Sequence, residues 1–299
     1  MKLELAIFLT TFLVFAVIAG ILAIVLTFIG AKGSVILALV FSIILVGIQW
    51  YIGPVIVKLV SGAKVVDESQ APELHAMISE LSNIAGIPKP QVCIVDNPTP
   101  NAFAFGRTQK SSYVAVHTGL LQRLNKNEVR SVLAHEIGHI KNRDVAAMTM
   151  ASVLPVFLYY IFLMVGGNDR RDSILTFLGA VIAQFIGQLF VLWLSRQREY
   201  YADAYSSRLV KDPIPLARAL VKISTDLQMA KDRGYKSEGI MNAFYFSEAE
   251  IVSDKIIDAI GMGKKEELKN ILKKENTVLE IFNTHPSVLK RIRALLNVD

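Results

Sequence analysis

The chain has 299 residues, of which 53% are hydrophobic and 19% are charged, and its net charge is +6. This charged fraction is low for a soluble domain of this length, which argues against an ordinary soluble globular protein. No basic cluster interleaved with aromatic residues appears in the chain, so the sequence does not indicate a nucleic-acid-binding protein.

Four uncharged apolar segments dominate the chain: Leu5 to Ile29, Ser34 to Val57, Ala146 to Val165 and Ser173 to Leu194. Each has about the 20 residues that a helix needs to cross a bilayer. Buried core helices of a soluble protein are the alternative, and a cleaved signal peptide is excluded because the first segment is too long and a second follows at once. We expect four transmembrane helices in two hairpins, although polar residues and a proline interrupt the second pair.

The distribution of Lys and Arg predicts the orientation of these segments. Ten of these residues lie between Lys58 and Asp144 and eighteen lie after Leu194, whereas the two short turns between the spans hold three. Loops rich in Lys and Arg stay on the cytoplasmic side of a membrane. We therefore expect a multi-pass protein of the cell membrane whose polar parts face the cytoplasm, with some attraction to anionic lipids.

The polar region between the two hairpins has a readable order of elements. A helix is expected from Ala71 to Ala85, followed by short strands at Gln91 to Val95, Ala102 to Gly106 and Ser112 to His117. A new helix begins near Asn125, where Glu128 stands three residues later in a capping-box pattern. Cys93 lies in the first strand and is interpreted as a packed thiol.

The second of these helices carries His135, Glu136 and His139 in the pattern H-E-x-x-H. Residues four apart share one helix face, so His135 and His139 can bind one tetrahedral metal ion, which we expect to be Zn²⁺. Glu136 can then accept a proton from a zinc-activated water and deliver it to the leaving amine. The alternative is an amphipathic helix with two incidental histidines.

A catalytic zinc site needs a third protein ligand. His75 and His117 are candidates without a specific argument in their favour. Glu199 is the stronger candidate, because two antiparallel spans of similar length would return it beside His139; a salt bridge to Arg196 or Arg198 is its alternative role. Asp203 lies on the same face and can orient a ligating histidine.

Two further features remain open at this stage. Asp144 is either a partner of the metal ligands or a helix-end carboxylate, and we favour the latter. The run from Asn101 to Gly106 suits a strand beside a cleft, where an extended peptide could add to its edge, although an ordinary core strand would have the same pattern. Asn101, Ala102 and Phe103 are the candidate substrate-binding residues.

Taken together, the motif His135 to His139, the run Arg198 to Asp203, and Thr284 to Ser287 with Arg291 resemble the HtpX branch of membrane zinc endopeptidases, related to the type I CaaX prenyl proteases. The resemblance covers nearly the whole chain. It implies that Glu199 is the third zinc ligand. It also implies that His285 acts near the substrate oxyanion and that Arg291 supports it.

We therefore expect a mainly α membrane protein with an α+β catalytic domain that contains a small sheet. Its parts would be an N-terminal transmembrane hairpin (1–60), the first catalytic part (61–144), a second hairpin (145–195) and a helical catalytic part (196–299). The expected function is hydrolysis of internal peptide bonds in misfolded or damaged membrane proteins, as quality control. The alternatives are a CaaX-type prenyl-protein protease and a non-catalytic scaffold with a vestigial metal site.

Overall fold

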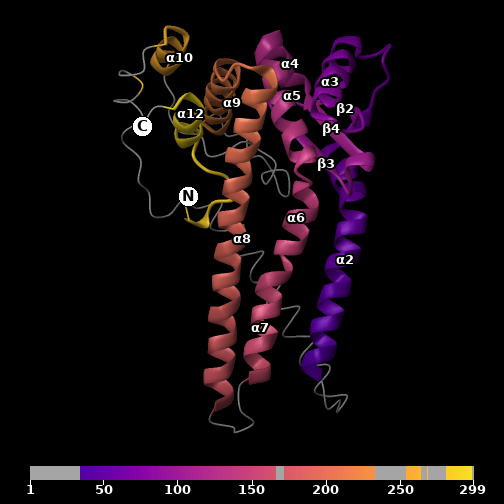
Figure 1. The fold of residues 1–299 in the computed structure, drawn as a ribbon, viewed down its shortest axis with the longest axis vertical. Helices are drawn as coiled ribbons and strands as arrows, with labels where there is room; N and C mark the ends of the chain where they lie inside the picture. The colour runs from indigo at the N-terminus through magenta and orange to yellow at the C-terminus, as the bar shows by residue number, and fades with distance from the viewer. Residues whose placement is uncertain (1–33, 166–171, 233–253, 264–267, 269–280, 298–299) are drawn as a thin grey trace. The chain divides into compact units, whose positions relative to one another are not determined.

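The computed structural model describes residues 34–165, 172–232, 254–263, 268 and 281–297. The first apolar segment, Leu5 to Ile29, and the turn at residues 166–171 lie outside the described residues. The described helices, drawn in Figure 1, are α2 (Ser34–Ser61), α3 (Pro72–Ala85), α4 (Thr118–Arg123), α5 (Lys126–Lys141), α6 (Asp144–Ala151), α7 (Val153–Val165), α8 (Asp172–Val210), α9 (Ile214–Asp232), α10 (Asp254–Gly261) and α12 (Val288–Leu296). The strands are β1 (Lys64–Val65), β2 (Gln91–Val95), β3 (Ala102–Gly106) and β4 (Ser112–His117), with a 3₁₀ turn, η1, at Gln109–Ser111.

The described chain forms two compact units. One consists of the described parts of residues 1–52, 146–195 and 281–283, and the other of the described parts of 53–145, 196–280 and 284–299. Among the described residues, three helical stretches are long and apolar enough to cross a membrane: Ile36–Ser61, Asp144–Met164 and Ile174–Val210. The mainly helical architecture with a small sheet expected from the sequence is therefore confirmed for the part that the structure describes, and three of its helical stretches are candidate membrane spans.

The first unit contains the apolar helices, and glycines set how closely two of them pack. A Cβ atom on Gly179 of α8 would lie 2.2 Å from the ring of Phe162 of α7, and one on Gly187 would lie 2.8 Å from the Cα atom of Pro155. Small residues allow this close approach between helices in a bilayer. The single segment expected from Ala146 to Val165 is broken between α6 and α7, because Pro155 has no N–H to donate to the carbonyl four residues earlier.

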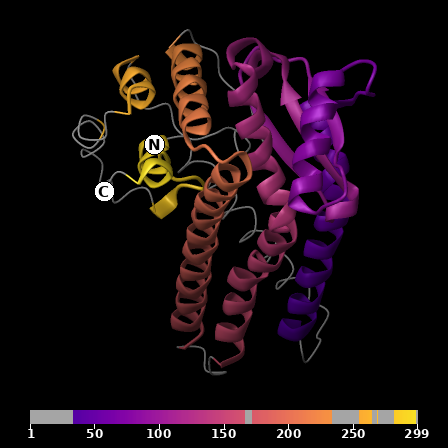
Figure 2. The same cartoon turned by 45° about the horizontal axis from the view of Figure 1, so that its top comes forward.

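The second unit is built on a four-stranded mixed sheet in the order β1-β2-β4-β3. β2 and β4 run parallel, whereas β1 and β3 pair antiparallel to their neighbours. The three longer strands have the predicted bounds, and the short β1 was not expected. Figure 2 shows the sheet beside α3 and α5.

Alternate side chains of the sheet belong to two different apolar cores. Val92, Val114 and Ala102 pack with buried residues of α3 and α5 on one face. Cys93 and Phe103 point to the other face, where Val57 near the end of α2 packs against them. Because successive residues of a strand point to opposite faces, both faces of this short sheet are covered, which explains its nearly continuous apolar strands.

Helix α3 ends as the sequence predicts. Gly86 follows its last residue and adopts a left-handed conformation with φ of 65°, and its N–H bonds back to the carbonyl of Asn83. A residue without a Cβ atom adopts this conformation at no steric cost. The turn directs the chain into β2, which lies beside the strand that precedes the motif helix.

Candidate metal and active site

The start of α5 fixes the helix that carries the H-E-x-x-H motif. The side chain of Asn125 accepts a hydrogen bond from the Glu128 N–H at 3.0 Å, and the Glu128 carboxylate accepts one from the Asn125 N–H at 2.9 Å. This is the predicted capping box. Glu128 is 1% exposed and also accepts a hydrogen bond from Lys222 of α9 at 2.8 Å, so the same carboxylate connects α5 to α9.

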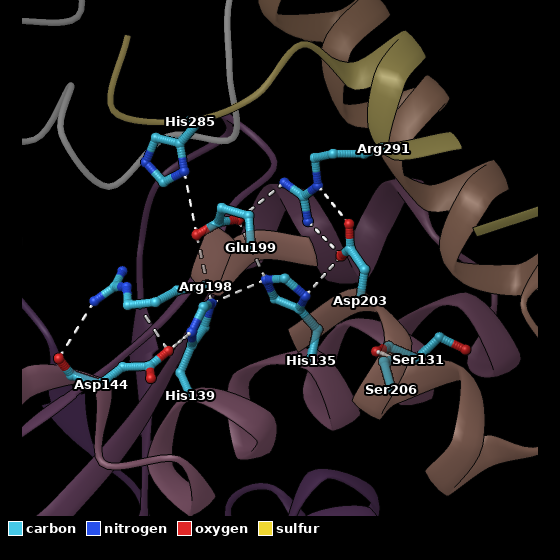
Figure 3. Close-up of polar contacts among 10 residues, drawn as sticks. All are labelled: Ser131, His135, His139, Asp144, Arg198, Glu199, Asp203, Ser206, His285 and Arg291. Atoms are coloured by element: carbon cyan, nitrogen blue, oxygen red, sulfur yellow. Dashed lines mark hydrogen bonds and ion pairs between the residues drawn. The ribbon is translucent and has the colours of Figure 1, made fainter. Parts of the chain in front are cut away.

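His135, His139 and Glu199 converge on one point, with one potential ligand atom of each lying within 4.8 Å of the others. The two Nε2 atoms of the histidines are 3.1 Å apart. The Glu199 carboxylate oxygens lie 3.7 Å from the Nε2 atom of His135 and 3.6 Å from that of His139. Figure 3 shows the three side chains facing one another.

These separations fit a metal ion held by all three residues. Ligand atoms about 2.0–2.1 Å from a tetrahedral zinc lie about 3.3 Å from each other. The distances of 3.1 to 3.7 Å bracket that value. Both Nδ1 atoms face carboxylates instead, so each histidine presents its Nε2 atom to the common point. The set of donors can therefore hold a divalent metal ion.

Asp203 lies one turn after Glu199 on α8 and holds the first histidine. Its Oδ1 atom is 2.9 Å from the Nδ1 atom of His135. Arg291 of α12 donates to both oxygens of Asp203, at 2.8 and 2.6 Å, and its Nη1 atom lies 3.2 Å from Glu199. Arg291 is fully buried, and although burial lowers its pKa, the charges of Asp203 and Glu199 raise it overall. Arg291 thus holds Glu199 directly and His135 through Asp203.

Asp144 holds the second histidine, which corrects the interpretation of this residue as a helix-end carboxylate. Its Oδ2 atom is 2.5 Å from the Nδ1 atom of His139, and its side chain is 8% exposed. Burial alone would lower the pKa of His139, but the hydrogen bond with Asp144 and the nearby carboxylates raise it overall. The spacing of five residues between His139 and Asp144 does not predict this contact, because the contact depends on how the chain turns after α5.

A glycine allows α8 to approach α5 closely enough for Glu199 to reach the histidines. A Cβ atom on Gly138 would lie 3.2 Å from the ring of Tyr205 and 3.4 Å from the Cα atom of Ala202. Both contact residues are on α8, within one or two turns of Glu199. The small residue between the two histidines therefore sets the spacing of the two helices that supply the ligands.

Glu136, the central acid of the motif, is 3% exposed and lies between the metal ligands and the sheet. Burial raises the pKa of its carboxyl group, and the two neighbouring histidines oppose that rise. Its carboxylate accepts a hydrogen bond from the backbone N–H of Ala104 in β3. This contact places the predicted general base directly beside the strand that was expected to border a cleft.

The hydrogen-bond pattern of β3 determines which of its backbone groups pair with β4 and which point away from it. The N–H of His117 donates to the carbonyl of Asn101 at 2.9 Å, and these two residues are opposite each other in the antiparallel register. Bonded pairs alternate in such a ladder, so Phe103 bonds to β4 while Ala102 and Ala104 point their N–H and C=O groups away from it. β3 is the last strand of the sheet in the part of the chain that is described.

Two of the predicted substrate-binding residues differ in their surroundings. Asn101 is fully buried, and neither polar atom of its side-chain amide has a hydrogen-bond partner among the described residues. The Phe103 ring packs in the core that also contains Cys93 and Ala115, and its ring centroid is 6.0 Å from that of His117. The sequence analysis named Phe103 as a candidate substrate-binding residue and did not name Ala104. The alternation of residues that bond to β4 with residues that point away from it could have distinguished the two.

The other histidines have separate positions. The Nδ1 atom of His285 is 3.3 Å from Glu199, so the structure brings this residue to the site. The Nε2 atom of His75 lies 3.0 Å from the carbonyl oxygen of Val66, and the Nδ1 atom of His117 lies 2.9 Å from the carbonyl oxygen of Thr99. Neither belongs to the group of three potential ligands found among the described residues.

Comparison with known proteins supports this assignment of the motif. The model of peptidase family M48 matches residues 68–299. A protease HtpX homologue of Methanothermobacter thermautotrophicus is 45% identical over 223 residues, which cover 74% of this chain and 86% of the relative. One from Moorella thermoacetica is 36% identical over 272 residues, covering 87% of this chain and 83% of the relative.

A solved structure gives the same picture of the fold. The crystal structure of Ste24p from S. mikatae matches with a TM-score of 0.57 at 21% identity. The match covers 96% of this chain, and the chain spans 64% of the length of that protein. A likeness at this identity concerns the fold alone. The family model and the relatives agree with the geometry of the motif, and the chain therefore belongs to peptidase family M48.

Proposed function

We propose that this protein is a membrane-bound zinc endopeptidase that hydrolyses internal peptide bonds of misfolded or damaged membrane proteins. The observation that carries the proposal is the convergence of His135, His139 and Glu199, with Glu136 beside them. Two histidines and a glutamate from two helices are a typical ligand set for a catalytic zinc, which keeps one position open. Membership of a peptidase family supports the reaction class.

Glu136 serves as the general base and acid. Bound zinc would supply a Lewis acid that polarises the substrate carbonyl and makes water a usable nucleophile near neutral pH. The Glu136 carboxylate takes a proton from the attacking water and returns it to the leaving amine. The Ala104 N–H orients this carboxylate, and burial raises the pKa of the Glu136 carboxyl group, which favours its role as a proton acceptor.

His285 stabilises the developing oxyanion. Its contact with Glu199 places its imidazole beside the ligand set, and the ring can donate a hydrogen bond from the nitrogen that does not face Glu199. Arg291 acts through Asp203 and Glu199, because it donates hydrogen bonds to the first carboxylate and forms an ion pair with the second.

The substrate main chain adds to the free edge of β3. Ala102 supplies its N–H and C=O groups and Ala104 supplies its C=O group, because these point away from β4 while the Ala104 N–H donates to Glu136, and β-strand addition uses such groups for affinity. Asn101, whose amide has no partner among the described residues, donates to or accepts from the same peptide. Phe103 supports the strand from the core and does not contact the substrate main chain.

The apolar helices anchor the enzyme in the cell membrane, with four spans and the site on the cytoplasmic side. α8 has 39 residues and is therefore about 58 Å long, roughly twice the thickness of the hydrocarbon core. Its apolar first half can span the bilayer while its second half carries Glu199. The four parts expected from the sequence, with boundaries near residues 60, 144 and 195, remain our proposal for the domain organisation.

Metal analysis combined with proteolysis tests this function. We expect one zinc per purified chain, lost on Glu199→Ala. Glu136→Gln should retain zinc and abolish cleavage, because removal of a general base costs about 10²- to 10⁴-fold in rate. Normal zinc content and wild-type cleavage in Glu199→Ala would overturn the ligand assignment, and normal cleavage in Glu136→Gln would support a scaffold instead.

Two further measurements address substrate class and orientation. An unfolded membrane protein should be cleaved in preference to a prenylated peptide, and the reverse preference would support the CaaX-type alternative. Reporter fusions after Val60 and after Gly167 should report opposite sides of the membrane, with the first in the cytoplasm. Reports from the same side would exclude a complete crossing by residues 146–165.

A further inference from the structure

The two histidines of the motif are each held by a carboxylate, and each carboxylate lies beside an arginine. On the first side, Arg291 donates to Asp203, which contacts His135. On the second side, Asp144 contacts His139, and the side chain of Arg198 reaches Asp144. Figure 3 shows these two rows of side chains meeting at the ligand set. The sequence left the role of Asp144 open and suggested Arg198 only as an ion-pair partner of Glu199.

The backbone after α5 brings Asp144 back to His139. Asn142 ends the helix with a bond to the Gly138 carbonyl, and Arg143 then adopts a left-handed conformation with φ of 56°. This conformation is costly for a residue with a Cβ atom. It lies between the end of α5 and Asp144, the first residue of α6, whose carboxylate contacts the last histidine of α5, so a strained turn is retained where it serves the site.

Arg198 connects the turn after α5 to α8, the helix that supplies the third ligand. Its Nη1 atom donates to the backbone carbonyl of Asp144 at 3.3 Å, and its Nε atom is 3.9 Å from the Asp144 carboxylate. Arg198 immediately precedes Glu199 on α8, and its side chain is 19% exposed. The arginine can therefore fix the position of α8 relative to the turn after α5.

We infer that Asp144 and Arg198 form a positioning pair that orients His139 for metal binding. This inference rests on the proposed zinc site and adds two residues to it. A carboxylate that accepts the Nδ1–H of a ligating histidine fixes its tautomer, directs its Nε2 atom to the metal and raises its basicity. Arg198 acts through Asp144, and neither residue touches the substrate or the metal.

Zinc affinity of the purified full-length protein, measured in detergent by competition with a fluorescent zinc chelator, tests the pair. Asp144→Ala should weaken zinc binding about 10- to 100-fold, the usual effect of removing such a partner. Asp144→Asn should weaken it less, because the amide oxygen can still accept the Nδ1–H. Arg198→Met should give a smaller loss than Asp144→Ala, and Arg198→Lys should recover part of it.

A double variant shows whether the two residues influence zinc binding through the same contact or independently. If Arg198 acts through Asp144, the combination of Asp144→Ala and Arg198→Met should bind zinc no more weakly than Asp144→Ala alone. If the losses of zinc affinity in the two single variants multiply in the double variant, the coupling between the two residues is overturned. Arg143→Gly should keep the zinc affinity, since glycine tolerates the left-handed turn, whereas Arg143→Val should lower it.

Arg123 and Asp226 provide a matched control, because their ion pair of 2.8 Å has a similar composition and Asp226 contacts none of the proposed ligands. Asp226→Asn should leave zinc affinity unchanged, and the zinc-free variants should unfold at temperatures close to that of this control. If the wild type binds no zinc, both the proposed function and this inference fail. If the wild type binds zinc and Asp144→Ala and Arg198→Met bind it equally well, only the positioning pair is overturned.

Discussion

The hydroxyl of Ser206 donates a 2.7 Å hydrogen bond to the backbone carbonyl of Ser131, and both residues are fully buried. Ser131 precedes His135 by one turn of α5, and Ser206 follows Asp203 by about one turn of α8. The bond therefore fixes the register between the helix with the two histidines and the helix with the glutamate. A change of one helical turn in that register would move Glu199 by about 5 Å, beyond the reach of a shared metal ion.

Ser206→Ala should lower both stability and metal affinity. The loss of one buried hydrogen bond costs about 1 kcal/mol, and the Ser131 carbonyl keeps its bond within α5. We expect a lower thermal unfolding midpoint in detergent and weaker zinc binding. Ser224→Ala is the control, since its buried hydroxyl bonds to Val221 within the same helix. Equal zinc affinity in the two variants would show that the bond between α5 and α8 does not influence the site.

Gly138→Val should prevent assembly of the ligand set. A branched side chain at this position would overlap with Tyr205 and the backbone at Ala202, so α8 would have to move away from α5. We expect loss of bound zinc, measured by metal analysis, and a much smaller effect from Gly138→Ala. Gly53→Ala, where a Cβ atom meets nothing within 4 Å, should leave zinc content unchanged. Full zinc content in Gly138→Val would contradict the close packing.

Arg291→Met should destabilise the protein more than any surface substitution. It removes the cation that lies between Asp203 and Glu199 and leaves these two buried carboxylates without their arginine partner, at a cost of about 3–5 kcal/mol. Added zinc should restore part of the unfolding midpoint, because it binds Glu199 in the folded state. Arg293→Met on the same helix serves as the comparison, and an equal shift in both variants would refute the special role of Arg291.

Cys93 should be unreactive in the folded protein. It is fully buried in β2, and burial raises the pKa of its thiol to about 11. Since the thiolate is the reactive form, alkylation by iodoacetamide at pH 8 should be at least about 100-fold slower than in denaturant. Mass spectrometry of the alkylated chain measures the two rates. Rapid alkylation without denaturant would contradict the packed position and reopen a chemical role for this residue.

Much of the local structure followed from the sequence because its causes are local. The strand bounds, the capping box at Asn125 and the glycine that ends α3 depend on residues within a few positions of one another. The pair His135 and His139 needs only the period of a helix to share a face. Uncharged length alone predicted the long apolar helices, three of which are present in the described residues.

Contacts between distant segments depended on the tertiary structure. Asp144 reaches His139 only because Arg143 adopts a left-handed conformation, and no residue preference predicts that for an arginine. The role of Ala104 and the core position of Phe103 follow from the register of β3 against β4, which is set by the packing of the sheet.

The sequence by itself therefore determined the chemistry of the site: two histidines and a glutamate on one helix beside the membrane, with Glu199 as the expected third ligand. The sequence also suggested Asp203 and Arg291 as supporting residues, whereas the tertiary structure decided that Asp144 and Arg198 lie against the second histidine of the motif. Metal ligands are recognised by residue type and short spacing, whereas Arg291, Arg198 and Ser206 act at positions that only the packing of α5, α8 and α12 brings together. Packing depends on the whole chain, and a short motif carries no information about it.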